Sequence, residues 1–71
     1  MSKDQLIRIT GVKSLTGISK SYIYQLCQED RFPKPVALIS GGTSVAWVAS
    51  EVQSWIDQRI AERDAGGAFN E

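Results

Sequence analysis

The apolar residues of this chain fall into short groups, each bounded by polar turn residues. An apolar run interrupted by one charge at residues 6–9 predicts a short strand. Thr10 is predicted to cap a first helix, with Val12 and Leu15 on its apolar side. Gly17 is expected to end that helix, since glycine readily adopts the left-handed conformation that follows a last turn.

A second helix is predicted to begin directly after this turn. Ser19 is a strong N-cap residue, and Ile18 before it can contact Ile23 as a hydrophobic staple. Apolar residues at the i, i+3 and i+4 positions predict the buried side of the helix: Ile23, Leu26 and Cys27. Two short helices joined by a turn of three residues indicate a helix-turn-helix.

A hairpin and a third helix complete the pattern. The segment 32–35 contains two prolines and is expected to end the second helix, because proline has no N–H to donate. Runs rich in β-branched residues at 36–39 and 45–48 predict two strands, and the glycine-containing loop 40–44 predicts a hairpin between them. Residues 50–53 match a capping box. Helical spacing follows in Val52, Trp55, Ile56, Arg59 and Ile60.

The order of these elements predicts an α+β fold, a small winged helix-turn-helix with three helices and a β-hairpin wing. We assign residues 1–65 to this domain and 66–71 to a flexible tail, because the tail has two glycines and no apolar period. Trp47 and Trp55 are expected to pack together in the core. A chain of 71 residues is long enough for one small domain without an enclosed substrate pocket.

Polar side chains occupy the side of the second helix opposite its apolar residues. At about 100° per residue, Ser21, Gln25 and Gln28 point this way, with Lys20 and Tyr24 at the edge. Amide side chains can pair bidentately with adenine, so this side is predicted to contact DNA, with plain solvation as the alternative. For Tyr24, a phosphate contact and packing at the helix edge both remain open. The predicted DNA-binding residues are Ser19, Lys20, Ser21, Tyr24, Gln25, Gln28, Lys34, Gly41, Gly42, Thr43 and Ser44.

The charges of the chain sum to zero, which taken alone argues against nucleic-acid binding. Their distribution is uneven, since the first 35 residues hold six basic and three acidic side chains, whereas residues 36–71 hold two basic and five acidic ones. A basic surface can therefore meet phosphate although the sum vanishes, with solvated charges as the alternative.

The composition does not support a disulfide-rich secreted protein, a membrane protein or an enzyme. Cys27 is the single cysteine, so no disulfide framework is expected, and no apolar run suits a signal peptide or a membrane span. We expect a cytoplasmic, nucleoid-associated protein. There is no histidine, no evident acidic pair and no metal-ligand cluster, so we predict no enzyme activity, no catalytic residue, no metal and no cofactor.

Four segments of the sequence resemble the AlpA family of small phage and prophage regulators: 6–9, 15–24, 31–36, and Trp47 with 50–56. The resemblance extends to about Arg63. It implies a winged helix-turn-helix of the excisionase and MerR-like type, with Ser21, Tyr24 and Gln25 on the recognition helix and residues 41–44 on the wing. Family members often carry arginine in the wing, before the tryptophan and in place of Gln25, so phosphate attraction is expected to be weaker here.

We therefore expect a sequence-specific binder of double-stranded DNA that acts as a transcriptional regulator or as a recombination directionality factor. Weak binding by one copy predicts self-association on tandem DNA sites. The alternative is a protein-interaction module that binds an integrase, RNA polymerase or another regulator.

Overall fold

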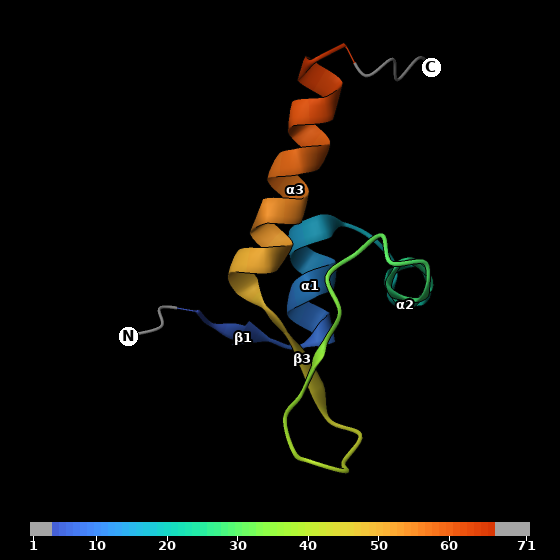
Figure 1. The fold of residues 1–71 in the computed structure, drawn as a ribbon, viewed down its shortest axis with the longest axis vertical. Helices are drawn as coiled ribbons and strands as arrows, with labels where there is room; N and C mark the ends of the chain where they lie inside the picture. The colour runs from blue at the N-terminus through green and yellow to red at the C-terminus, as the bar shows by residue number, and fades with distance from the viewer. Residues whose placement is uncertain (1–3, 67–71) are drawn as a thin grey trace.

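A computed structural model describes residues 4–66 as three helices and a three-stranded antiparallel sheet (Figure 1). The elements are β1 (Leu6–Ile7), α1 (Ile9–Thr16), α2 (Lys20–Gln28), β2 (Val36–Ala37), β3 (Val45–Val48) and α3 (Ala49–Asp64). This is the predicted α+β winged helix-turn-helix. Of the expected tail, residues 67–71 lie outside the described part of the chain.

The sheet has the order β1-β3-β2, so the N-terminal strand, shorter than the predicted run 6–9, lies beside the hairpin. Its paired residues are Leu6 with Val48, Ile7 with Trp47, Val36 with Ala46, and Ala37 with Val45. β2 is shorter than the predicted run 36–39. Beyond β2 the Leu38 N–H still donates to the Ser44 carbonyl at 2.9 Å, and the turn is closed by Gly42 donating to the Ile39 carbonyl at 2.9 Å.

The turn between α1 and α2 follows the sequence prediction closely. Gly17 has φ 74°, and its N–H donates to the Lys13 carbonyl at 2.8 Å. The Ser19 hydroxyl accepts a hydrogen bond from the Tyr22 N–H at 3.2 Å. The predicted cap of α1 is wrong, because Arg8 is its N-cap and Thr10 lies within the first turn. Pairing of β1 with β3 ends at Ile7, so the helix begins as soon as the chain leaves the sheet.

Replacing Ser19 with alanine should lower the free energy of unfolding by about 1 kcal/mol, because the N–H that its hydroxyl satisfies loses its partner. Thr10→Ala is the matched control and should leave stability nearly unchanged, since Thr10 is a solvent-exposed residue within α1 and is not its N-cap. Urea denaturation followed by circular dichroism measures both effects. Equal losses in the two variants would contradict the capping role of Ser19.

The end of α2 differs from the prediction. The helix stops at Gln28, before the proline segment, because Asp30 adopts φ 59°. The Asp30 N–H donates to the Cys27 carbonyl at 3.2 Å, and the Arg31 N–H reaches the Leu26 carbonyl at 2.8 Å. This is the Schellman arrangement, in which a left-handed residue satisfies the last carbonyls of a helix.

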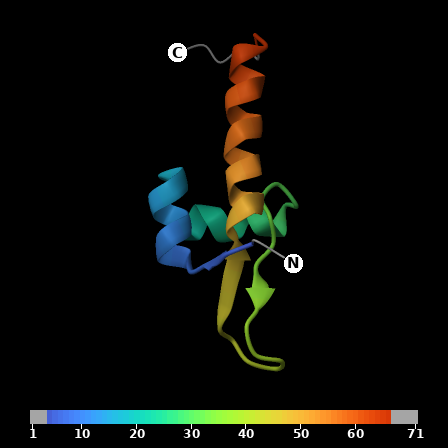
Figure 2. The ribbon, with the colours of Figure 1, turned by 90° about the vertical axis from the view of Figure 1, so that its left-hand side faces the viewer.

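The start of α3 also differs, since Val48 rather than Ser50 is its N-cap. The Ala49 N–H donates to the Gln5 carbonyl at 2.6 Å, and the Ser50 hydroxyl donates to the Asp4 carboxylate at 2.7 Å. The segment leading into β1 thus supplies a partner for the start of the helix and removes the need for a capping box. α3 then rises away from the sheet on the side opposite the hairpin loop (Figure 2).

The core lies between the sheet and the three helices. Its buried members are Val12, Ile23, Leu26, Cys27, Phe32, Trp47 and Val52. The tryptophans have different ring partners from those expected: Trp47 packs edge-on against Tyr24 at 5.8 Å between centroids, and Trp55 against Phe32 at 4.9 Å. Strand β3 carries Trp47 toward α2, whereas α3 carries Trp55 toward the segment after α2. The apolar side of α3 is only partly covered, since Ile60 is 43% exposed.

Candidate nucleic-acid interface

The outward side of α2 carries the polar residues that the sequence analysis selected. Ser21, Gln25 and Gln28 are exposed, as is Lys20 in the first turn. Tyr24 is half-buried, with its ring against Trp47, so its ring packs at the helix edge. The predicted set thus divides into an exposed polar surface and one aromatic side chain that supports it.

Hydrogen bonds to the segment after α2 hold this helix and the hairpin in a fixed relation. The Pro33 carbonyl accepts from the Trp47 indole N–H at 2.9 Å and from the Cys27 thiol at 3.5 Å. The Trp55 indole N–H donates to the Arg31 carbonyl at 2.8 Å. Burial raises the pKa of the Cys27 thiol, in agreement with a packing role for this cysteine. The indole N–H groups of Trp47 on β3 and Trp55 on α3 therefore hold the segment between α2 and β2 in place by hydrogen bonds.

Two of the predicted DNA-binding residues contact carboxylates in the structure. The Gln25 amide donates to Glu29 at 3.2 Å, and the Lys34 ammonium lies 2.8 Å from the Asp30 carboxylate. Lys34 lowers the pKa of Asp30 through a hydrogen bond and its charge, and the carboxylate raises the pKa of Lys34 in turn. Exposed pairs of this kind contribute little stability, so phosphate can replace the carboxylate at Lys34. The i, i+4 spacing is the sequence signal for the pair that begins on α2, Gln25 with Glu29. Asp30 and Lys34 lie beyond the helix, so helical spacing does not indicate their pair.

Other basic side chains are not engaged in this way. Within residues 4–66, Arg8, Lys13 and Lys20 form no ion pair. Lys20 stands at the start of α2, one residue after the capping Ser19. It is therefore the cation of α2 that is available to phosphate.

The hairpin places the remaining predicted residues away from α2, with Lys34 on the connection between the two elements. Gly41, with φ 77°, Gly42 and Thr43 are exposed, and Ser44 is half-buried. Two exposed apolar residues of this loop were not among the predicted site residues, Leu38 at 40% and Ile39 at 65%. Their place in a predicted strand concealed them, because β2 ends before them.

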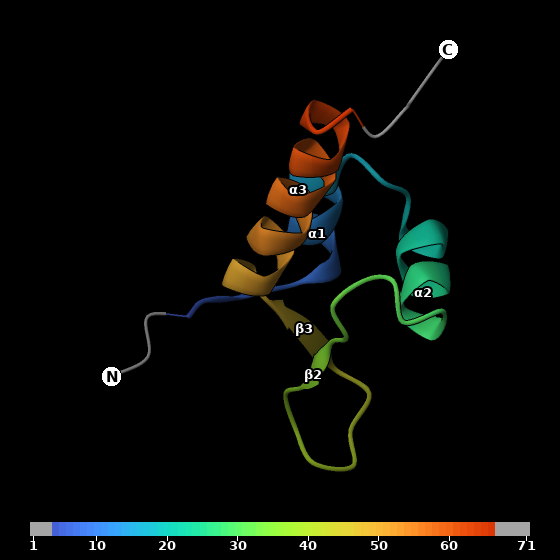
Figure 3. The same cartoon turned by 45° about the horizontal axis from the view of Figure 1, so that its top comes forward.

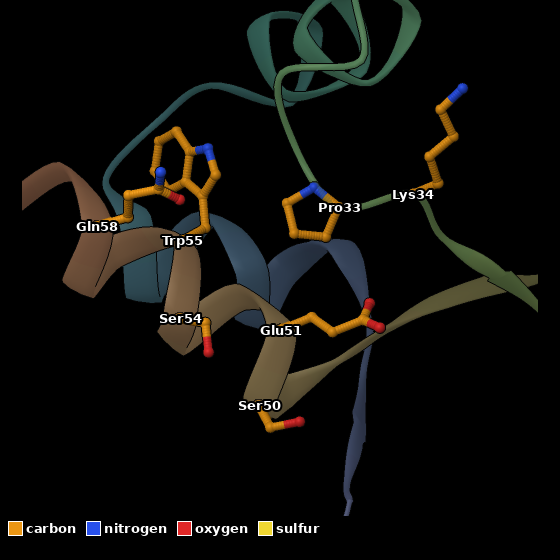
Figure 4. Close-up of a pocket in the computed structure, with 7 residues that line it drawn as sticks. All are labelled: Pro33, Lys34, Ser50, Glu51, Ser54, Trp55 and Gln58. Carbon is orange, nitrogen blue, oxygen red and sulfur yellow. The ribbon is translucent and has the colours of Figure 1, made fainter.

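An open depression of about 490 Å³ lies between α3 and the segment after α2 (Figure 4). Its lining residues are Pro33, Lys34, Ser50, Glu51, Ser54, Trp55 and Gln58. In the part of the chain that the structure describes, no three His, Cys, Asp or Glu side chains gather into a possible metal site. The described helices also fall short of the length and apolar character needed to cross a membrane.

Two comparisons with known proteins agree with the resemblance of the sequence motifs. A family model described as prophage CP4-57 regulatory protein (AlpA) matches residues 5–60. The chain is also 41% identical over 66 residues to the uncharacterized protein ORF88 of enterobacteria phage P4, an alignment that spans 93% of this chain and 73% of the phage protein. Both matches include α2 and the hairpin.

Proposed function

Because this chain belongs to the AlpA family of prophage regulatory proteins, we propose that it binds double-stranded DNA in a sequence-specific manner. It acts as a phage or prophage transcriptional regulator or as a recombination directionality factor, and it works in the cytoplasm on DNA of the nucleoid. The observation that carries this proposal is the exposed side of α2, where hydroxyl and amide groups stand on a helix capped at both ends.

In this proposal α2 enters the major groove. Ser21, Gln25 and Gln28 face base edges, where an amide pairs with adenine N6 and N7. Lys20 and Lys34 contact phosphate, the latter after exchanging Asp30 for a phosphate oxygen. The hairpin lies against the neighbouring DNA. With few cations, each copy binds weakly, so several copies occupy tandem sites in the same direction.

Salt dependence tests the proposal directly. One copy has few unpaired cations near α2, so it should neutralise few phosphates, and log K against log salt should have a slope shallower than about −5. Fluorescence anisotropy with a labelled duplex selected from a randomised pool measures the slope, and a duplex of random sequence is the control. Absence of duplex binding at about 50 mM salt would contradict DNA binding and favour the protein-interaction alternative.

A further inference from the structure

The hairpin is free of charge along its whole length. No acidic or basic residue occurs between Lys34 and Glu51, so the hairpin has no cation with which to hold a phosphate. The tip of the hairpin is the loop of residues 39–43, which the hydrogen bond between Leu38 and Ser44 closes. In this tip Ile39 is 65% exposed, more than any other large apolar side chain in the described part of the chain. Leu38 beside it is 40% exposed. The tip therefore presents apolar surface to its surroundings.

The backbone holds Ile39 in a defined turn. Leu38 on one side and Gly42 on the other donate the hydrogen bonds that close the loop, each at 2.9 Å. A Cβ atom on Gly42 would lie 3.3 Å from the Ile39 carbonyl and 3.4 Å from the Ile39 Cβ, so Gly42 packs directly against Ile39. A tip ordered in this way loses little conformational entropy when it binds.

The position and shape of the tip restrict what it can meet. It lies at the opposite end of the molecule from the end of α3, beyond the body that the helices form (Figures 1 and 3). Addition of a partner strand at the edge of the sheet is disfavoured, because β2 has two residues and follows Pro35, which has no N–H. A narrow, uncharged turn that exposes Ile39, with Leu38 beside it, is suited to insertion into a gap.

We propose that Ile39 is an apolar wedge that inserts between base pairs in the minor groove beside the sequence that α2 contacts. The inference rests on the proposed DNA binding. Isoleucine and leucine are among the side chains that unstack base steps and kink DNA, and such wedges need no charge of their own. Ser40 and Thr43 follow Ile39 in the same loop, and their hydroxyl groups can form hydrogen bonds with the DNA backbone. Burial of Ile39 thus takes the place of an electrostatic grip.

The substitution Ile39→Ser tests the wedge on a selected duplex that carries a single site. We expect affinity to fall about tenfold, because the apolar side chain no longer leaves water on binding. The bend, measured by energy transfer between dyes at the duplex ends, should decrease in the bound state. The slope of log K against log salt should not change, since no charge is removed. Ile39→Leu should retain both affinity and bend.

Ile60→Ser is the control, because Ile60 is an exposed apolar residue of α3 far along the chain from the tip. It should leave binding and bending unchanged. Wild-type affinity and bend in Ile39→Ser would overturn the wedge, as would a loss confined to self-association in sedimentation, which would assign the tip to protein contact. Failure of the wild-type protein to bind any duplex would instead overturn the proposed function, and the wedge with it.

Discussion

Trp47→Ala is expected to leave about half of the protein unfolded at 25 °C, because the loss is comparable to the total stability. Trp47 has no exposed surface, its ring packs against Tyr24, and its indole N–H donates to the Pro33 carbonyl. Truncation of a buried tryptophan costs about 3–5 kcal/mol, and a core in a chain of this size rarely supplies more than about 3–5 kcal/mol in total. The expected loss is thus comparable to the entire stability.

Urea denaturation followed by circular dichroism measures this effect, and a matched pair of milder variants separates packing from hydrogen bonding. Trp47→Phe and Trp55→Phe each remove one indole N–H that donates to the segment after α2. The first should lose more stability, about 1–3 kcal/mol from the bond, because the Trp47 bond is partly buried whereas water replaces the donor more readily at the exposed Trp55 bond. A wild-type urea midpoint in Trp47→Ala would show that the core does not depend on this residue.

Gln25→Ala is expected to lose roughly 1–3 kcal/mol of binding free energy on the preferred duplex and almost none on random DNA. An amide that contacts a base contributes little where that base is absent. The substitution also removes the amide that donates to Glu29, an exposed contact whose loss is common to both duplexes, so the ratio of the two affinities is the quantity to compare. Titrations by fluorescence anisotropy on both duplexes supply this ratio.

Lys20→Ala is the control for this experiment. Lys20 is exposed in the first turn of α2, so its loss should weaken both duplexes by a similar factor and make the salt slope shallower by about 1. An unchanged site preference in Gln25→Ala would mean that α2 does not face the bases in the proposed orientation.

Local signals were sufficient for several elements of the fold. Gly17 and Ser19 interact with residues three or four positions away, so the turn between α1 and α2 could be located from neighbouring residues alone. The buried side of α2 follows in the same way from helical spacing, and its exposed polar side follows by geometry. The hairpin was located by its β-branched runs, although β2 is shorter than its run. The contact of this side of α2 with DNA stays a prediction.

Contacts between residues distant in the sequence account for the remaining features. The start of α3 depends on Gln5 and Asp4, more than forty positions earlier. The local sequence at Ser50, which matches a capping box, therefore could not predict where the helix begins. The end of α2 is an exception, because it is local: Asp30 adopts a left-handed conformation, and the hydrogen bonds to Cys27 and Leu26 end the helix before any proline is reached.

The ring partners of the tryptophans and the exposure of Ile39 also depend on how segments that are distant in the sequence meet in space. Trp47 and Trp55 lie on elements that approach different parts of α2 and the segment after it, so their partners depend on how β3 and α3 are oriented. Ile39 belongs to an apolar run, and it becomes the most exposed large apolar side chain of residues 4–66 only because the sheet pairing stops before it. Helical spacing and turn residues are properties of neighbours along the chain, whereas burial and pairing depend on which segments meet in space.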